Sequence, residues 1–263
     1  MTDILNPILL GLVEGITEFL PVSSTGHLLI AEHWLGHRSD VFNVVIQAGA
    51  ILAVVLIYRQ RLWQLATGLG QPANRDYALK LATAFMITAG LGLAATKFGF
   101  KLPESITPVA WALIIGGLWM LGAEWMAAKQ PDRTSITWRV AILVGLAQVV
   151  AGIFPGTSRS AATIFIAMLA GTSNRAAATE FAFLVGIPTM FAASAYELLK
   201  AYKSGGVQED WSALTIAFVV SLVTAFVAVK WLLGYIRTHR FTPFAMYRIV
   251  LGVALLALIP NGV

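Results

Sequence analysis

Residues 14–27 read EGITEFLPVSSTGH and interrupt a long apolar stretch of this chain. A second interruption, residues 154–163, reads FPGTSRSAAT and lies in equally apolar surroundings. Charged groups are costly at membrane depth, where an acid costs about 2.5–3.5 kcal/mol at the bilayer centre on insertion scales. We therefore interpret both interruptions as parts of a functional site inside a membrane protein.

The composition of the chain supports a protein that crosses the membrane several times. Of its 263 residues, 58% are hydrophobic and only 12% are charged, which argues against a soluble domain. The sequence has no cysteine, which excludes disulfides, thiol nucleophiles and iron–sulfur sites. The net charge of +5 comes from Lys and Arg between apolar segments, as membrane orientation requires, so we expect no nucleic-acid partner. The first residues lack a basic region, and we expect no removable signal peptide.

Six apolar segments are long enough to cross a bilayer at about 1.5 Å per residue. They are, approximately, Val41–Tyr58, Tyr77–Gly99, Pro108–Ala127, Ala176–Leu199, Trp211–Ile236 and Phe241–Pro260. Two further apolar regions, about Ile4–Leu35 and Trp138–Ala170, are each broken by a turn rich in Pro, Ser and Thr. Their halves are too short to cross, so we expect two re-entrant helix pairs. The predicted fold is an all-α integral membrane protein of ten helices.

The two interruptions align with each other. Pro21 and Pro155 are 134 positions apart, and the same offset pairs Ser24 with Ser158. We interpret this offset as an internal repeat within one membrane domain, with repeats at about 1–130 and 131–263. Each repeat holds one re-entrant pair and three spans, and this odd number of crossings predicts that the second repeat is inverted.

Basic residues predict the orientation of the chain. They follow the first, third and fifth spans, and the positive-inside rule places these three loops in the cytoplasm. They are Arg59, Arg61, Arg75, Lys129, Arg133, Arg139, Arg237 and Arg240. Both termini then lie outside, and the two re-entrant pairs enter from opposite faces and meet near the midplane. Many secondary transporters share this architecture, so a transporter or flippase is the alternative function.

Glu14 and Glu18 are four residues apart on one helix, so their carboxylates share a face. Two carboxylates in a low dielectric repel each other unless a cation lies between them or one is protonated. Hard divalent cations such as Mg²⁺ and Ca²⁺ bind carboxylates, and Mg²⁺ commonly adds phosphate oxygens of a substrate. We predict a metal site at this pair, with a protonated acid or a water-filled vestibule as the alternative.

The proline of the first turn ends one helix, and Ser23, Ser24 and Thr25 begin the next. Free backbone N–H groups at a helix start attract anions, so we predict that these residues contact the substrate. His27 lies three residues beyond Ser24, within reach as an acid or base. Helix-capping serines and a structural histidine are the alternative interpretation.

The second interruption supplies a cation. Gly156, Thr157, Ser158 and Ser160 surround Arg159 at another helix start. Hydroxyls and backbone N–H groups there can cradle a phosphate that the guanidinium clamps, whereas an arginine that reaches the membrane interface is the alternative. The acids and the imidazole come from one repeat and the cation from the other, and this specialisation favours an enzyme.

Three other polar residues lie within predicted spans. Gln47 and Glu180 are candidates to line the cavity or to pair with nearby groups, and Arg248 is a candidate partner for a buried acid.

Residues 14–27 and 155–160 resemble the two signature motifs of the undecaprenyl-diphosphatase family of the bacitracin-resistance type. The resemblance covers nearly the whole chain and includes residues 47–54, 180–184 and 243–248. It implies hydrolysis of undecaprenyl diphosphate to undecaprenyl phosphate and inorganic phosphate, which recycles the lipid carrier of cell-wall synthesis. It also implies a multi-pass protein of the bacterial inner membrane, a site open to the outer face, and a divalent metal. Expected partners are undecaprenyl diphosphate, membrane lipids and, in a homodimer, a second copy.

The resemblance also assigns roles to residues. Ser24 matches the nucleophile, His27 the acid/base, Arg159 the phosphate clamp, and Glu14 and Glu18 the essential acids. We expect His27, oriented by Glu18, to deprotonate Ser24, and direct attack by water is the open alternative. Ala161 stands where the family pattern has glycine, which adds a methyl group beside the phosphate turn.

Overall fold

The computed structural model describes residues 2–97, 106–203 and 210–258, and within these ranges it contains eleven α-helices and no strand. The helices are α1 Thr2–Thr17, α2 Ser24–Leu35, α3 Asp40–Ile57, α4 Arg59–Thr67, α5 Pro72–Lys97, α6 Ile106–Ala127, α7 Trp138–Ile153, α8 Arg159–Ala170, α9 Arg175–Lys203, α10 Trp211–Tyr235 and α11 Thr242–Leu258. The predicted all-α class is confirmed.

Five of the six predicted spans are helices long and apolar enough to cross a membrane, namely α3, α5, α6, α9 and α10. The sixth corresponds to α11, which has 17 residues. Some predicted segments lie outside the described residues. They are residues 98–99 of the second span, residues 259–260 of the sixth span, and most of the loops that follow the second and fourth spans. The two broken regions form the helix pairs α1–α2 and α7–α8.

The prediction of ten helices is wrong because α4 follows α3 directly, where we expected a loop. Its nine residues contain neither Gly nor Pro, and Gly68 follows its last residue. Only Leu65 is buried, while Arg61 donates to Glu180 of α9 at 3.2 Å. A search for spanning segments overlooks such a short, mostly polar helix.

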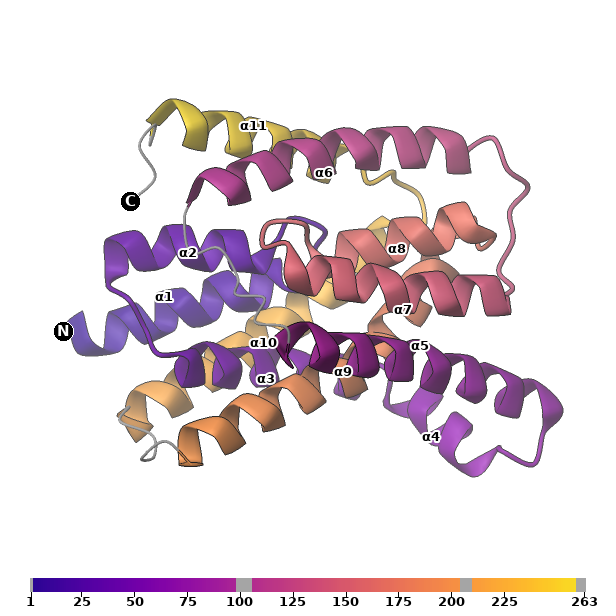
Figure 1. The fold of residues 1–263 in the computed structure, drawn as a ribbon, viewed down its shortest axis with the longest axis horizontal. Coiled ribbons are helices and arrows are strands. Elements are labelled where there is room, and N and C mark those ends of the chain that lie inside the picture. The colour runs from indigo at the N-terminus through magenta and orange to yellow at the C-terminus, as the bar shows by residue number, and fades with distance from the viewer. Residues whose placement is uncertain (1, 98–105, 204–209, 259–263) are drawn as a thin grey trace.

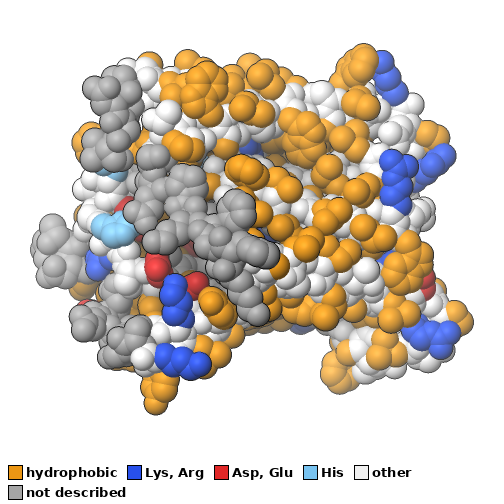
Figure 2. All heavy atoms as spheres, viewed as in Figure 1, with side chains coloured by type: hydrophobic (Ala, Val, Ile, Leu, Met, Phe, Trp, Pro, Cys, Tyr) orange, Lys and Arg blue, Asp and Glu red, His pale blue; other side chains and the backbone are white. Residues whose placement is uncertain are grey.

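The helix pairs α1–α2 and α7–α8 lie at opposite ends of the molecule, and their turns approach each other in its middle (Figure 1). Hydrophobic side chains cover much of the visible outer surface, whereas Lys and Arg lie mainly toward the ends (Figure 2). On α6, for example, Trp111, Ile115 and Leu118 are exposed. Large exposed apolar side chains of this kind fit a surface in contact with lipid.

The turn between α1 and α2 and the turn between α7 and α8 end in the same kind of serine cap, but their register differs by one residue from the predicted alignment. Ser23 caps α2 and Ser158 caps α8, and these are the only non-glycine residues with positive φ in the described chain, at 77° and 68°. The caps pair Ser23 with Ser158, so Ser24 corresponds to Arg159. The predicted pairing of Ser24 with Ser158 is therefore wrong.

The shift arises because the segment from the proline to the cap is one residue longer in the second turn. Ser23 follows Pro21 by two positions, whereas Ser158 follows Pro155 by three. Gly156 lies in this longer segment between Pro155 and Ser158, and its φ is +90°. A Cβ there would lie 2.8 Å from the carbonyl oxygen of Val109, so this position requires glycine for its conformation and for its space.

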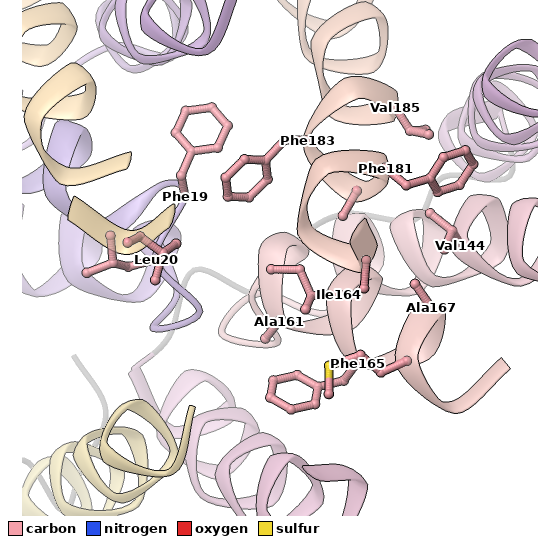
Figure 3. Packing of buried hydrophobic residues seen from close by; sticks show 14 of the residues in the cluster. Phe19, Leu20, Val144, Ala161, Ile164, Phe165, Ala167, Phe181, Phe183 and Val185 are labelled. Atoms are coloured by element: carbon pink, nitrogen blue, oxygen red, sulfur yellow. The ribbon is translucent and has the colours of Figure 1, made fainter. Parts of the chain in front are cut away.

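Apolar packing anchors the first turn. Phe19 and Leu20 are buried, and the ring of Phe19 meets that of Phe183 edge to face with centroids 5.1 Å apart (Figure 3). Between the turns, Ser160 donates to the carbonyl oxygen of Leu20 at 2.9 Å. The turns are thus fixed relative to α9 and to each other.

Glycines allow the helices beneath the turns to approach closely. A Cβ on Gly11 would lie 2.6 Å from the carbonyl oxygen of Ala217 in α10, and one on Gly145 would lie 2.8 Å from that of Ala84 in α5. In addition, α6 and α11 contact each other through Gly117 and Gly252. The first helix of each pair, α1 and α7, therefore packs on a long apolar helix of the other predicted repeat.

Arg248 of α11 holds both turns in place. Its guanidinium, fully buried, donates to the carbonyl oxygens of Gly156 at 2.9 Å, Thr157 at 3.0 Å and Ala112 at 3.1 Å, with that of Pro21 at 3.5 Å. The described residues form no ion pair with this cation, and its observed partners are carbonyl groups rather than the buried acid for which it was a candidate. Carbonyl groups partner both terminal nitrogens of the guanidinium because each carries a partial negative charge, whereas its Nε has no partner among the described residues.

We expect the substitution Arg248→Met to destabilise the protein. Methionine fills similar space but leaves the carbonyl groups without their donors, at a cost of roughly 1–3 kcal/mol for each. Thermal unfolding in detergent, followed by tryptophan fluorescence, should show a lower midpoint for this variant. Arg237→Met, which removes an exposed arginine, is the control, and equal midpoints for the two variants would contradict the role of Arg248.

Candidate active site

A small polar cleft lies where the two turns meet. It is lined by Glu18, Ser23, Ser24 and Thr25 of the first turn, by Gly156, Ser158 and Arg159 of the second, and by Ala151 of α7. Seven of the eleven predicted site residues therefore share one cleft. The other four, Glu14, His27, Thr157 and Ser160, do not line it.

Glu18 is at the centre of this cleft. Its Oε2 accepts a hydrogen bond from the hydroxyl of Ser24, and its Oε1 lies 3.7 Å from Nη2 of Arg159. The Glu18 side chain is buried, whereas that of Arg159 is partly exposed. A hydroxyl, a carboxylate that can take its proton, and a guanidinium able to bind an anion are thus adjacent.

Ser24 and Arg159 are the first residues of α2 and α8. The caps Ser23 and Ser158 each leave free N–H groups in the first turn of the helix that follows. Their own hydroxyls accept from Gly26 N at 3.4 Å and Ala161 N at 3.2 Å. The cleft therefore receives the positive ends of two helix dipoles, and it is suited to bind a phosphate.

Glu14 lies one turn before Glu18 and is 1% exposed. Its Oε2 has no hydrogen-bond partner among the described residues, and the charges of Glu18 and Arg159 both act on it. Among the described residues, no group of three or more His, Cys, Asp or Glu side chains is arranged to hold a metal. Two carboxylates nevertheless fit Mg²⁺, because this ion commonly takes one or two carboxylates and completes its shell with phosphate oxygens and water.

Ser160 and Thr157 contribute to the structure of the turns. The hydroxyl of Ser160 lies 3.1 Å from that of Ser158 and donates to Leu20, while the carbonyl of Thr157 accepts from Arg248. Ala161 is buried at the third position of α8, so its methyl group is accommodated without loss of the cap.

The ring nitrogens of His27 are bound to partners other than Ser24. Its Nδ1 lies 2.7 Å from the carbonyl oxygen of Ser23, and its Nε2 lies 2.7 Å from the hydroxyl of Tyr247. Both ring nitrogens are therefore engaged. The structure pairs Ser24 with Glu18 directly, which differs from the expected arrangement in which Glu18 orients His27.

Neither Gln47 nor Glu180 lines the cleft. Glu180 accepts from Arg61 at 3.2 Å and lies 3.5 Å from the hydroxyl of Tyr77, so it pairs with nearby groups, as the alternative interpretation held.

Two residues near the site carried no clear signal in the sequence. Tyr247 is distant in sequence from His27, and its position next to Arg248 was the one feature that drew attention to it. Gln148 lies one turn before Ala151 and is buried, with both polar atoms of its side chain lacking a partner among the described residues. It occupies in α7 the position that Glu14 has in α1.

A larger cavity of about 360 Å³ lies at the ends of α6, α8 and α10, beside the start of α9. Arg175 contributes to its lining, and its Nε lies 2.7 Å from the buried Glu124. The charges of Arg175 and Glu124 therefore compensate each other. No predicted catalytic residue reaches this cavity, so the cleft between the turns is the better candidate.

Known proteins resemble this chain over its whole length. A protein of Rhizobium johnstonii named undecaprenyl-diphosphatase is 69% identical over 261 residues, which are 99% of this chain and 98% of that protein. Proteins of the same name from Xanthomonas euvesicatoria and Xanthomonas campestris are 65% and 64% identical over 261 residues, again 99% of this chain and at least 98% of theirs. The family model described as bacitracin resistance protein BacA matches residues 7–254. The chain therefore belongs to the BacA family.

Proposed function

We propose that this chain hydrolyses undecaprenyl diphosphate to undecaprenyl phosphate and inorganic phosphate, and so recycles the lipid carrier of cell-wall synthesis. The names of its relatives support this reaction. The main structural support is that Glu18 accepts a hydrogen bond from Ser24 and also lies beside Arg159 of the other turn. The relatives bear the name of a hydrolase, which favours hydrolysis over transport of a polyprenyl phosphate.

The substrate binds with its terminal phosphate between the two helix starts. Arg159 and the backbone N–H groups offset the charge that develops on the transferred phosphoryl group. Ser23, Thr25 and Ser158 supply further polar contacts, because they line the same cleft.

Glu18 is the base that the geometry supports, because Ser24 already donates to it. As the proton moves to Glu18, Ser24 Oγ bonds to the terminal phosphorus, and the bond to the bridging oxygen breaks. The electron pair leaves with undecaprenyl phosphate, and water then releases phosphate from the phosphoserine. In the alternative, water attacks directly, and Ser24 only binds the phosphate.

Purified protein in detergent with Mg²⁺ should release phosphate from undecaprenyl diphosphate. Arg159→Ala should lower kcat by about 100-fold or more, the usual loss when a donor to a developing charge is removed. Arg139→Ala, a change to an exposed arginine of α7, should leave the rate unchanged. Ligand movement without phosphate release by the wild type would favour the transporter.

Rapid quenching with ³²P-labelled substrate separates the two chemical routes. The covalent route gives labelled wild-type protein and unlabelled Ser24→Ala. Absence of label from the wild type during turnover would leave direct attack by water.

We also propose that Glu14 and Glu18 hold a divalent cation, Mg²⁺ or Ca²⁺. The unpartnered Oε2 of Glu14 supports this proposal. When bound, the cation neutralises negative charge on the diphosphate.

Replacing Glu14 tests the metal site. Glu14→Gln should weaken binding of Mn²⁺, a spectroscopic substitute for Mg²⁺, by about tenfold or more in electron paramagnetic resonance titrations, because one anionic ligand is lost. Glu197→Gln, a change to a partly exposed acid of α9, is the matched control. Equal Mn²⁺ affinity of Glu14→Gln and wild type would remove Glu14 from the metal site.

We further propose that the protein lies in the bacterial inner membrane as an inverted repeat, with both termini outside and the cleft open to the outer face. Its five apolar spanning helices support a multi-pass protein. The reciprocal packing of α1 on α10 and α7 on α5 supports the repeat. The homodimer stays a prediction.

The natural absence of cysteine allows this orientation to be mapped. In intact cells, a membrane-impermeant maleimide should label His37→Cys, between α2 and α3, without permeabilisation. Arg133→Cys, between α6 and α7, should react only after the membrane is opened. The reverse pattern would invert the proposed topology.

A further inference from the structure

The ring of His27 links the first turn to α11. Its Nδ1 lies 2.7 Å from the carbonyl oxygen of Ser23, and its Nε2 lies 2.7 Å from the hydroxyl of Tyr247. The two rings are nearly parallel, with an interplanar angle of 11° and centroids 5.6 Å apart. This chain of contacts joins a residue in the second turn of α11 to the backbone beside Ser24.

The partners of His27 determine where its proton lies. A carbonyl oxygen only accepts, so Nδ1 must carry hydrogen to bond with Ser23. In a neutral imidazole, Nε2 then has no hydrogen and accepts from the hydroxyl of Tyr247. The hydroxyl of Tyr247 thereby favours the tautomer that binds the Ser23 carbonyl.

The backbone that His27 binds is strained. Ser23 has φ 77° and ψ 93°, and a side chain at positive φ costs of order 1–3 kcal/mol unless its surroundings hold it. Ser158 has the same unusual conformation in the second turn, where Arg248 binds the carbonyl oxygen of its neighbour Thr157. Consecutive residues of α11 therefore restrain both strained caps, Arg248 directly and Tyr247 through His27.

We propose that Tyr247 is a positioning residue for the hydrolysis, which acts through His27 to hold the Ser23–Ser24 backbone in the geometry that directs Ser24 to Glu18. The role rests on the proposed function. Neither Tyr247 nor His27 lines the cleft. His27, expected from the sequence to act as the base, has in this proposal the same positioning role.

A double-mutant cycle tests this relay. Tyr247→Phe keeps the ring but removes the hydroxyl, and it should lower kcat about tenfold, as loss of an orienting partner commonly does, while KM changes less than twofold. In the His27→Ala background the same substitution should have no further effect, because Tyr247 then has no imidazole to orient. Tyr202→Phe, which removes an exposed hydroxyl in α9, should match the wild type.

The second measurement needs no turnover. In ¹⁵N-histidine NMR spectra, the signal that His27→Ala deletes should report the Nδ1–H tautomer in wild type and a mixture in Tyr247→Phe. An unchanged tautomer together with an unchanged kcat would overturn the proposal, as would an equal loss of kcat in both backgrounds. If the wild type released no phosphate, the proposed function would fail, while the spectra would still test the contact between Tyr247 and His27.

Discussion

A turn inside a membrane protein must satisfy its own backbone polar groups, because hydrocarbon offers no hydrogen bonds. This chain brings two such turns together. The buried guanidinium of Arg248 meets much of the requirement, since it binds carbonyl groups of both turns and of α6. Burial of a cation costs several kcal/mol, and the four carbonyl groups offset part of that cost. The same contacts fix the distance between the turns, on which the cleft depends.

Fixed turns create the electrostatic character of the cleft. Glu18 and Arg159 come from different turns, and their charged atoms lie 3.7 Å apart, beyond a good hydrogen bond. The guanidinium therefore keeps donors for a ligand, while Ser24 already donates to Glu18. Because two helix starts add their dipoles, an entering phosphate meets preorganised donors and requires little rearrangement.

The sequence predicted the features that depend on composition and on interruptions of apolar segments. Long apolar segments predicted the spanning helices, and the two proline-containing turns predicted the helix pairs. It did not predict α4, because a short, mostly polar helix resembles a loop in a search for spans. It also missed the partners of Arg248 and His27. Every residue has a backbone carbonyl group, so a sequence does not show which carbonyl groups Arg248 binds. The contact between Tyr247 and His27 depends on the packing of α11 in the folded protein.

The one-residue difference between the turns changes how the two halves compare. An alignment through the prolines pairs Thr25 with Arg159, whereas the caps pair Ser24 with Arg159. The first position of a helix is where a side chain lies nearest to an anion bound at the free N–H groups. Both helix pairs therefore present a polar side chain to the cleft from the same helical position, one a hydroxyl and the other a cation. The longer segment between Pro155 and Ser158 includes Gly156, whose φ of +90° is suited to glycine, and it ends in a cap with a positive φ like that of Ser23.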